Sequence, residues 1–266
     1  MKTQFSVLIL FISQIISVSA QMDDKFYYPR KDLKSVEWTN YEELKFPVEK
    51  DTLSVLLLKP TKKIKATVFY FHGAGGNNTY YLPLIHPLLV EGYQVVMIDF
   101  RGYGNSTGIP THLNIAEDGQ KVFDELIKRK DIKDTHKIIF GASMGTQIAT
   151  LLAEKNQNKI NGLVLDGPIS SFGDIAVFYT HEFKEYLEKS YISPYSAKEN
   201  IKSIQNIPIL IIHSKEDKEV PFEQGMIVFS NANSPKEFFE YSGEHLQGIL
   251  LESSKILSKM NEMLEK

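Results

Sequence analysis

Three residue types that together carry out nucleophilic catalysis follow one another along this chain: a serine, then acidic residues, then a histidine. The serine, Ser143, is the centre of the sequence Gly141-Ala142-Ser143-Met144-Gly145. A serine hydroxyl becomes a nucleophile when a histidine removes its proton and a carboxylate orients that histidine. The pattern predicts acyl transfer through a covalent acyl-enzyme, with Ser143 as the nucleophile.

The segments around Ser143 predict the geometry that such a nucleophile needs. The apolar residues 137–140 predict a β-strand that leads directly into Gly141, and residues 146–156 predict a helix that follows Gly145. A strand, a sharp turn and a helix form the nucleophile elbow, which exposes the serine hydroxyl. Glycine is expected on both sides of the serine because a side chain there would collide with the neighbouring strand or helix.

Three histidines follow Ser143 and could act as the base. His245 lies in the loop between the last predicted strand and the last predicted helix, at the sheet edge where the elbow emerges. His213 ends a strand and is expected to be packed or to support a loop, and His181 lies in an irregular segment. The sequence therefore favours His245, since the order serine, acid, histidine is typical of this arrangement.

The acid is expected directly after a strand that lies between Ser143 and His245. Residues 208–213 form that strand, and its exit loop carries Glu216 and Asp217. Both are candidates. The spacing to Val220-Pro221, which opens the next helix, favours Asp217, whereas Glu216 fits a solvated loop carboxylate better.

Two backbone N–H groups are expected to stabilise the negative charge that develops on the substrate oxygen. One belongs to Met144, the residue after the nucleophile, and the other to the glycine-rich loop 71–77, where Ala74 is the candidate. A phosphate-binding loop is excluded because no Lys-Ser/Thr follows these glycines. His72 is expected to be structural, because it precedes Ser143 and His245 is better placed.

The rest of the chain alternates between predicted strands and helices. The strands are continuously apolar, which is typical of a parallel sheet with helices on both faces. We expect strands at 53–59, 66–71, 93–100, 137–140, 160–165, 207–213 and 237–241, and helices at 80–91, 115–130, 146–156, 222–232 and 246–264.

One segment departs from this alternation. The roughly forty residues between Asp166 and the predicted strand 207–213 contain no predicted strand and are rich in aromatic residues. We expect a small cap, inserted at about residues 169–206 over the C-terminal edge of the sheet, whose aromatic side chains form an apolar wall beside the site.

Composition excludes several classes of protein. A chain of 266 residues with 42% hydrophobic and 24% charged residues can bury a sizeable core. Its formal net charge is −3 and its lysines and arginines are scattered, so nucleic acid is not an expected partner. It has no cysteine, which excludes disulfides, a catalytic thiol and thiolate metal sites.

The N-terminus predicts export. A positive start at Met1-Lys2 precedes an uncharged apolar stretch, and Val18-Ser19-Ala20 places small residues where a signal peptidase cleaves. We expect residues 1–20 to be a signal peptide and residues 21–266 to form one secreted or periplasmic domain without a stable membrane span. The alternative is an uncleaved N-terminal membrane anchor, but the stretch is short and no basic residues follow it.

These segments together resemble the α/β-hydrolase superfamily, and they are similar to its small bacterial-type serine aminopeptidase/ABHD-like serine hydrolases. The resemblance covers residues 26–262 and rests on residues 71–77, 99–106, 141–145, 213–221 and 243–245. It implies an α/β-hydrolase fold with a mostly parallel central sheet, flanking helices and a small helical cap. It also implies a Ser143–Asp217–His245 triad, backbone donors at Ala74 and Met144, and no metal or organic cofactor.

The leading functional hypothesis is hydrolysis of a carboxylic ester or thioester with a small or lipid-like acyl group, which the aromatic cap favours. Peptidase or amidase activity is the second reading, ranked lower because no paired acidic residues are clearly placed to bind a substrate amine. A third reading is a non-catalytic binding protein of the same fold. The presence of Ser143, Asp217 and His245 argues against it, because such proteins usually lose one of the three.

Overall fold

The computed structural model of the protein describes residues 22–265, and the predicted signal peptide therefore lies outside the described residues. None of the helices within residues 22–265 combines the length and the apolar character needed to cross a lipid bilayer.

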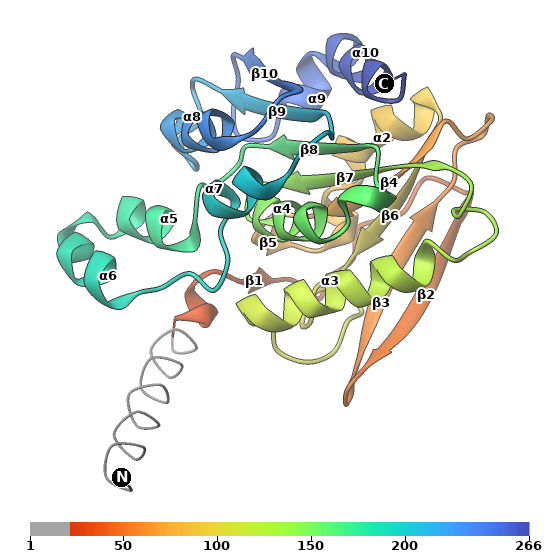
Figure 1. Ribbon diagram of the computed structural model, residues 1–266. Helices are drawn as coiled ribbons and strands as arrows, with labels where there is room; N and C mark the ends of the chain where they lie inside the picture. Colours follow the sequence, from red (N-terminus) through yellow and green to blue (C-terminus); the bar gives the residue numbers. More distant parts are fainter. Residues whose placement is uncertain (1–21, 266) are drawn as a thin grey trace, which may run out of the picture.

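An eight-stranded sheet forms the centre of the molecule, in the order β10-β9-β8-β7-β4-β6-β3-β2 (Figure 1). Its strands are β2 (Tyr41–Val48), β3 (Asp51–Leu58), β4 (Ala66–Phe71), β6 (Tyr93–Ile98), β7 (His136–Ala142), β8 (Gly162–Asp166), β9 (Ile209–Ser214) and β10 (Lys236–Tyr241). Strands β4 and β6–β10 pair in parallel, whereas β3 pairs with both β2 and β6 in antiparallel fashion. The predicted mostly parallel sheet is confirmed.

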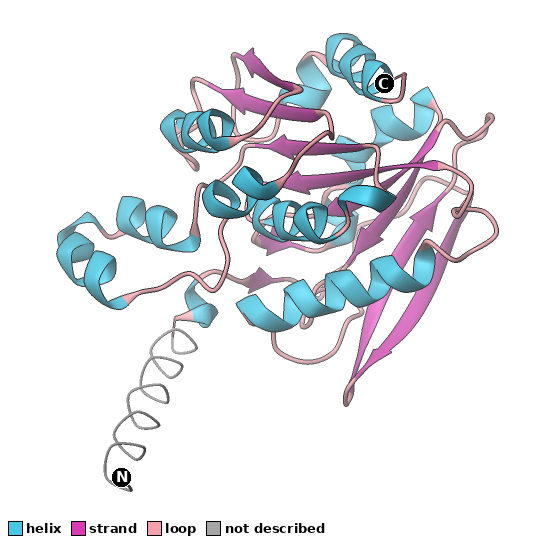
Figure 2. Ribbon diagram, in the orientation of Figure 1, coloured by secondary structure: helices cyan, strands magenta, loops and turns pink. Residues whose placement is uncertain are grey.

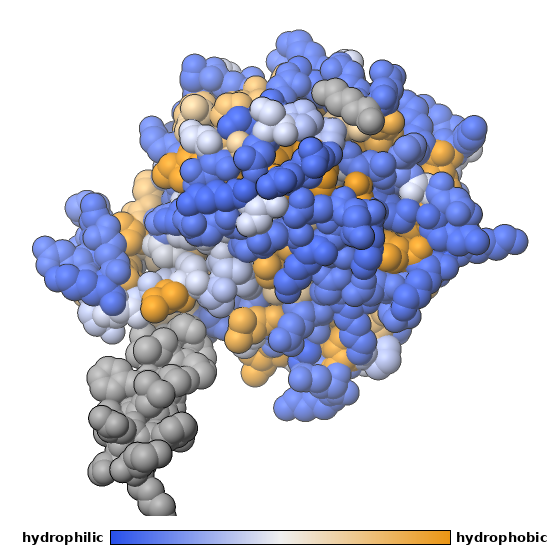
Figure 3. All heavy atoms as spheres, viewed as in Figure 1, coloured by the Kyte–Doolittle hydropathy of each residue, from blue (hydrophilic) through white to orange (hydrophobic). Residues whose placement is uncertain are grey.

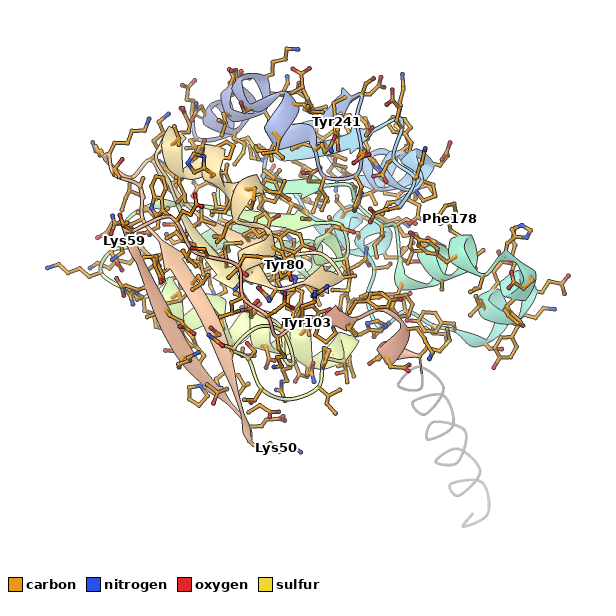
Figure 4. All side chains as sticks on the ribbon, turned by 180° about the vertical axis from the view of Figure 1, so that it is seen from behind. Lys50, Lys59, Tyr80, Tyr103, Phe178 and Tyr241 are labelled. Carbon is orange, nitrogen blue, oxygen red and sulfur yellow. The ribbon has the colours of Figure 1, made fainter. Side chains whose placement is uncertain are left out.

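The sequence reading missed strand β2. Its side chains alternate between exposed and partly buried positions, and Glu42, Glu43 and Lys45 interrupt any apolar run. A solvated edge strand needs only one apolar face, so it lacks the continuous apolar signal of the central strands. The β2–β3 hairpin projects from the sheet with Lys50 at its tip (Figure 4).

Helices cover both faces of the sheet (Figure 2). On one face lie α3 (His112–Leu126), α4 (Gly145–Lys155) and α8 (Phe222–Asn231), and on the other lie α2 (Leu82–Glu91), α9 (Gly248–Leu251) and α10 (Ser253–Met263). Successive strand residues pack on the two faces in turn: Phe69 and Phe71 on the α3 side, and Val68 and Tyr70 on the α2 side.

The sequence predicted one continuous helix over residues 246–264. This prediction is wrong, because the backbone leaves helical geometry at Glu252, between α9 and α10.

The segment between β8 and β9 contains short helices and no strand. These are α5 (Phe172–Tyr179), η4 (His181–Phe183), α6 (Lys184–Ser190), α7 (Ala197–Asn200) and η5 (Ile201–Ser203). Helices α5 and α6 extend to one side of the molecule (Figure 1). The aromatic residues expected to act together divide into two sets. Buried are Phe172, Tyr191 and Tyr195; exposed are Phe178, Tyr179, Phe183 and Tyr186.

The first described residues pack against the segment between β8 and β9, where Phe26 contacts Tyr191, and run beside the loop that follows β4. They form η1 (Asp23–Lys25) and β1 (Tyr28–Pro29), and β1 pairs in parallel with β5 (Gly75–Gly76). This pairing places the N-terminal segment beside the glycine-rich loop that follows β4.

Candidate active site

Ser143 occupies a strained turn between β7 and α4. Its φ is +53°, a conformation that costs a non-glycine residue about 1–3 kcal/mol and is concentrated at functional sites. The flanking glycines permit the close packing of this turn. A Cβ at Gly145 would lie 2.1 Å from the carbonyl oxygen of Phe71, and one at Gly141 would lie 2.6 Å from Cα of Thr146.

His245 follows β10 and is held by Asp217. Its Nδ1–H donates to Oδ2 of Asp217 over 2.6 Å, and its ring packs so closely on Gly167 that a Cβ there would lie 2.7 Å from Cε1. The other ring nitrogen, Nε2, is buried and has no hydrogen-bond partner among residues 22–265. His245 therefore has one nitrogen fixed by a carboxylate and a second that is free to accept a proton.

Asp217 is a fully buried carboxylate at the end of β9. Its Oδ1 accepts hydrogen bonds from the backbone N–H groups of Glu219 (2.9 Å) and Val220 (2.8 Å), and its Oδ2 faces His245. Burial raises the pKa of Asp217. Hydrogen bonds from His213, His245 and Val220 and the charge of His245 lower it by a larger amount, so the pKa of Asp217 lies well below the usual aspartate value. Asp217 is therefore ionised at neutral pH.

Glu216 and Asp217, the two candidate acids predicted from the sequence, lie in different environments. Glu216 is exposed, and no side-chain hydrogen bond of Glu216 occurs within the described part of the chain. Asp217, the next residue, is turned inward and bonded to His245. The fold thus brings Asp217, and not Glu216, to His245.

The pKa of His245 results from opposing effects. Burial lowers it, whereas the hydrogen bond and the negative charge of Asp217, together with Glu219 and Asp166, raise it by more. The net shift is upward, so the imidazole of His245 is a stronger base than an ordinary histidine side chain. Ser143 Oγ and His245 Nε2 do not share a hydrogen bond in this structure. Such contacts often tighten only when substrate binds.

His213 lies beside Asp217 and forms no hydrogen bond with His245 in the described part of the chain. Its Nε2 lies 3.1 Å from the carbonyl oxygen of Val220 and 3.4 Å from Oδ2 of Asp217. Its Nδ1 is packed against Gly225, where a Cβ would come within 2.1 Å, and has no partner in the described chain. The proton therefore sits on Nε2, which donates to the carbonyl oxygen of Val220 and has Oδ2 of Asp217 as its next nearest acceptor. His181, the third histidine considered, is exposed on η4.

The two expected backbone donors lie at the same cavity as Ser143. Among the described residues, neither the N–H of Ala74 nor that of Met144 has an acceptor, and both residues line the cavity. His72 helps to orient the first of them, because its Nδ1–H donates to the carbonyl oxygen of Gly73 over 2.7 Å and so fixes the peptide that carries the Ala74 N–H. Burial lowers the pKa of His72 to about 4, so it stays neutral.

A further carboxyl, which the sequence reading did not single out, lies beneath the site. Asp166 ends β8, and its carbonyl oxygen accepts from the N–H of Ser143 over 2.8 Å. Its side-chain Oδ1 is buried and has no partner in the described residues. Burial raises the pKa of Asp166 to about 7, against the lowering effect of the His245 charge.

The cavity beside Ser143 has a volume of about 730 Å³, within the range of small-molecule sites. Most of its lining is apolar, with Ile169, Ile175 and Ala176 from the segment after β8. Of the seven aromatic residues expected to form a wall there, all of them among the described residues, only Tyr179 lines the cavity. Figure 3 shows hydrophobic residues at the junction between α5–α6 and the rest of the molecule.

The N-terminal segment supplies part of the lining that the sequence did not predict. Met22, Lys25, Phe26 and Tyr28 all contact the cavity. No local sequence pattern predicts that residues 22–28 line the cavity, since this segment reaches the site through packing against elements that are distant in the sequence. Lys25 and Glu219 are the formally charged residues of the lining.

Comparison with known proteins places these features in context. The family model described as serine aminopeptidase, S33, matches residues 62–191. The Escherichia coli O157:H7 protein "Uncharacterized protein YfhR" is 28% identical over 228 residues, which cover 83% of this chain and 79% of that protein. "Lysophosphatidylserine lipase ABHD12" of Macaca fascicularis is 30% identical over 193 residues, 66% of this chain and 48% of that protein.

Among solved structures, the Pyrococcus furiosus esterase Pf2001 superimposes with a TM-score of 0.71 at 22% sequence identity. The match covers 90% of this chain and 97% of that chain. At this sequence identity, the similarity shows only that the two proteins have the same fold.

Proposed function

The chain belongs to the α/β-hydrolase superfamily, and we propose that it is a serine hydrolase that cleaves a carboxylic ester or thioester. One observation carries this proposal: His245 is hydrogen-bonded through Nδ1 to the buried carboxylate of Asp217, while its Nε2 has no hydrogen-bond partner within residues 22–265. A histidine so arranged is a general base for a serine at a strand-to-helix elbow, which is where Ser143 lies.

The proposed reaction has two steps. Nε2 of His245 takes the proton of the Ser143 hydroxyl as Oγ attacks the substrate carbonyl carbon, and the N–H groups of Ala74 and Met144 donate to the resulting oxyanion. The C–O or C–S bond then breaks, and His245 gives its proton to the leaving alcohol or thiol. Water attacks the acyl-enzyme with the same base, which releases the acid and restores Ser143. Asp217 stabilises the imidazolium in both steps.

The lining of the cavity supports an apolar acyl group as substrate. Its side chains are mostly aliphatic or aromatic, and Ser143 opens into it next to Met144. One relative bears the name lysophosphatidylserine lipase, so a lipid-like acyl ester is consistent with the similarity. The substrate class proposed is therefore a small-molecule or lipid-like acyl ester.

Peptidase or amidase activity is the second candidate. The matching family model is described as serine aminopeptidase, and Glu219 places one carboxylate at the cavity, where a free substrate amine could bind. A single exposed carboxylate is a weak amine site compared with the extensive apolar lining, so ester hydrolysis ranks first.

Active-site labelling tests the proposal directly. A fluorophosphonate probe should label the wild-type protein and Ser230→Ala, which removes an exposed hydroxyl on α8, but not Ser143→Ala. Rates with p-nitrophenyl esters and with aminoacyl p-nitroanilides then separate the two candidates. Labelling of a folded Ser143→Ala variant would refute the assignment of the nucleophile. A folded wild-type protein that takes no label would favour the non-catalytic reading.

A further inference from the structure

We propose that the N-terminal segment 22–28 determines which acyl groups the cavity accepts, with Phe26 and Met22 as the specificity-determining side chains. This inference rests on the proposed ester hydrolysis. The segment begins at the second residue after the predicted signal-peptide cleavage site. The start of the processed chain would therefore form part of the wall of the substrate cavity.

The cavity lining has contributions from five separate parts of the chain. Ala74, Gly75, Ser143 and Met144 surround the reacting atoms, and Glu219 and Val220 come from the loop that carries Asp217. The remainder comes from the α5 region and from the N-terminal segment. Met22 and Phe26 are partly buried and pack on the same apolar core as Ile175 and Ala176. An acyl chain that leaves Ser143 therefore meets apolar side chains of both the segment and α5.

Buried aromatic contacts hold Phe26 in place. Its ring meets Phe172 edge-on at a centroid distance of 5.4 Å and stacks on Tyr191 at 6.0 Å. It also contacts the ring of His112 at 5.0 Å. These three residues come from α5, from the segment after α6 and from the start of α3, so the Phe26 ring connects the cap region to the main sheet layer.

His112 holds the side chains of Asp23 and Tyr27 in the segment. Its Nδ1 accepts from the Tyr27 hydroxyl at 2.6 Å, and its Nε2 lies 2.8 Å from the Tyr191 hydroxyl and 3.1 Å from Oδ1 of Asp23. The backbone N–H of His112 donates to Oδ2 of Asp23 over 3.1 Å. Its side chain is only 1% exposed, and the burial lowers its pKa to about 3, so the imidazole stays neutral.

The other end of the segment is joined to the loop that carries the Ala74 donor. The N–H of Tyr28 donates to the carbonyl oxygen of Ala74 over 2.9 Å, and the hydroxyl of Tyr103 donates to the same oxygen. Figure 4 shows Tyr103 beside the start of β1. Because both ends are anchored, the Phe26 ring has a defined position relative to Ser143, and a wall with a defined position can discriminate between acyl chains.

The variant Phe26→Ala tests this role in the processed protein. We expect its preference to move toward longer or branched acyl groups, because removal of the ring enlarges the cavity at a fixed distance from Ser143. The measurement is kcat/KM for p-nitrophenyl esters from acetate to palmitate. Each methylene newly buried should raise kcat/KM by about fourfold relative to the acetate measured with the same variant.

A matched control removes a phenylalanine that does not line the cavity. Phe178 lies on α5 with 45% exposure (Figure 4), and Phe178→Ala should leave the chain-length profile unchanged. Met22→Ala is the second test variant, because the Met22 side chain takes part in none of the His112 hydrogen bonds described above, and its removal should shift the profile in the same direction even if Phe26→Ala fails to fold.

The outcomes separate this inference from the proposed function. If Ser143 takes the fluorophosphonate label but Phe26→Ala and Met22→Ala change all esters by the same factor, the segment is only structural and the inference is wrong. If the wild-type protein takes no label and cleaves no ester, the proposed function fails first. A shift of the optimum in either variant, with Phe178→Ala unchanged, supports the inference.

Discussion

Replacing Asp217 with asparagine tests the central geometry of the site. Oδ1 of Asp217 accepts from the N–H groups of Glu219 and Val220, so the amide oxygen of the asparagine must keep that position. The amide nitrogen then takes the place of Oδ2, where it faces Nδ1 of His245 as a donor. His245 must turn its lone pair on Nδ1 toward this donor and carry its proton on Nε2. The nitrogen that should accept the Ser143 proton is then blocked.

The expected loss is large because the wrong tautomer removes the base. In serine hydrolases with this arrangement, the equivalent change lowers kcat by about 10⁴, which corresponds to about 5 kcal/mol of transition-state stabilisation. The shape of the side chain is kept, so we expect the change to appear in kcat rather than in KM. Fluorophosphonate labelling should slow by a similar factor.

The pH dependence provides a second readout. In the wild-type protein, Asp217 raises the pKa of His245, so kcat/KM should increase with pH through an apparent pKa above the ordinary histidine value of about 6.5. Without the carboxylate, the lowering effect of burial is opposed only by Glu219 and Asp166, and the residual activity should show an apparent pKa lower than that of the wild type.

The neighbouring acid supplies the control. Glu216→Gln removes one negative charge from the same loop at an exposed position and should change kcat by less than twofold. Circular dichroism would establish that both variants are folded. The reasoning is refuted if folded Asp217→Asn keeps more than a tenth of the wild-type kcat, or if Glu216→Gln loses as much.

Three other predictions concern packing, ionisation and export. Gly145→Ala should destabilise the protein by at least about 2 kcal/mol in urea unfolding, because its Cβ would lie 2.1 Å from the Phe71 carbonyl oxygen. Gly75→Ala, whose Cβ meets nothing within 4 Å, should change stability little, and equal effects would contradict this account. Asp166 has a folded-state pKa of about 7, above its ordinary value of 3.8, so the folded state holds an extra proton between these values and its stability falls as pH rises through them. Asp166→Asn should therefore gain up to about 4 kcal/mol relative to wild type between pH 4 and pH 8, and a pH-independent difference would contradict the shift. We also propose that the protein is exported. Mass spectrometry of the secreted or periplasmic protein should then find an N-terminus directly after Ala20, whereas an intact chain in the membrane fraction would favour the anchored alternative.

Local sequence was sufficient to predict the elements that carry the site. Apolar runs of strand length, helical periodicity and the glycines around Ser143 each reflect constraints within a few residues. The predicted fold class is confirmed, and β4 begins and ends at the residues expected. The loops that bear Ala74, Asp217 and His245 were found for the same reason, since each follows a recognisable strand at the same edge of a parallel sheet.

Tertiary structure alone decided what depends on burial and long-range contact. Glu216 and Asp217 are adjacent and chemically similar, and only the fold turns one outward and the other toward His245. Phe26 reaches the cavity through contacts with residues that lie far away in sequence, such as His112 and Phe172. Short-range patterns record the dihedral preferences and the apolar faces of single elements. The side chains that line a cavity are determined by how distant elements pack against one another.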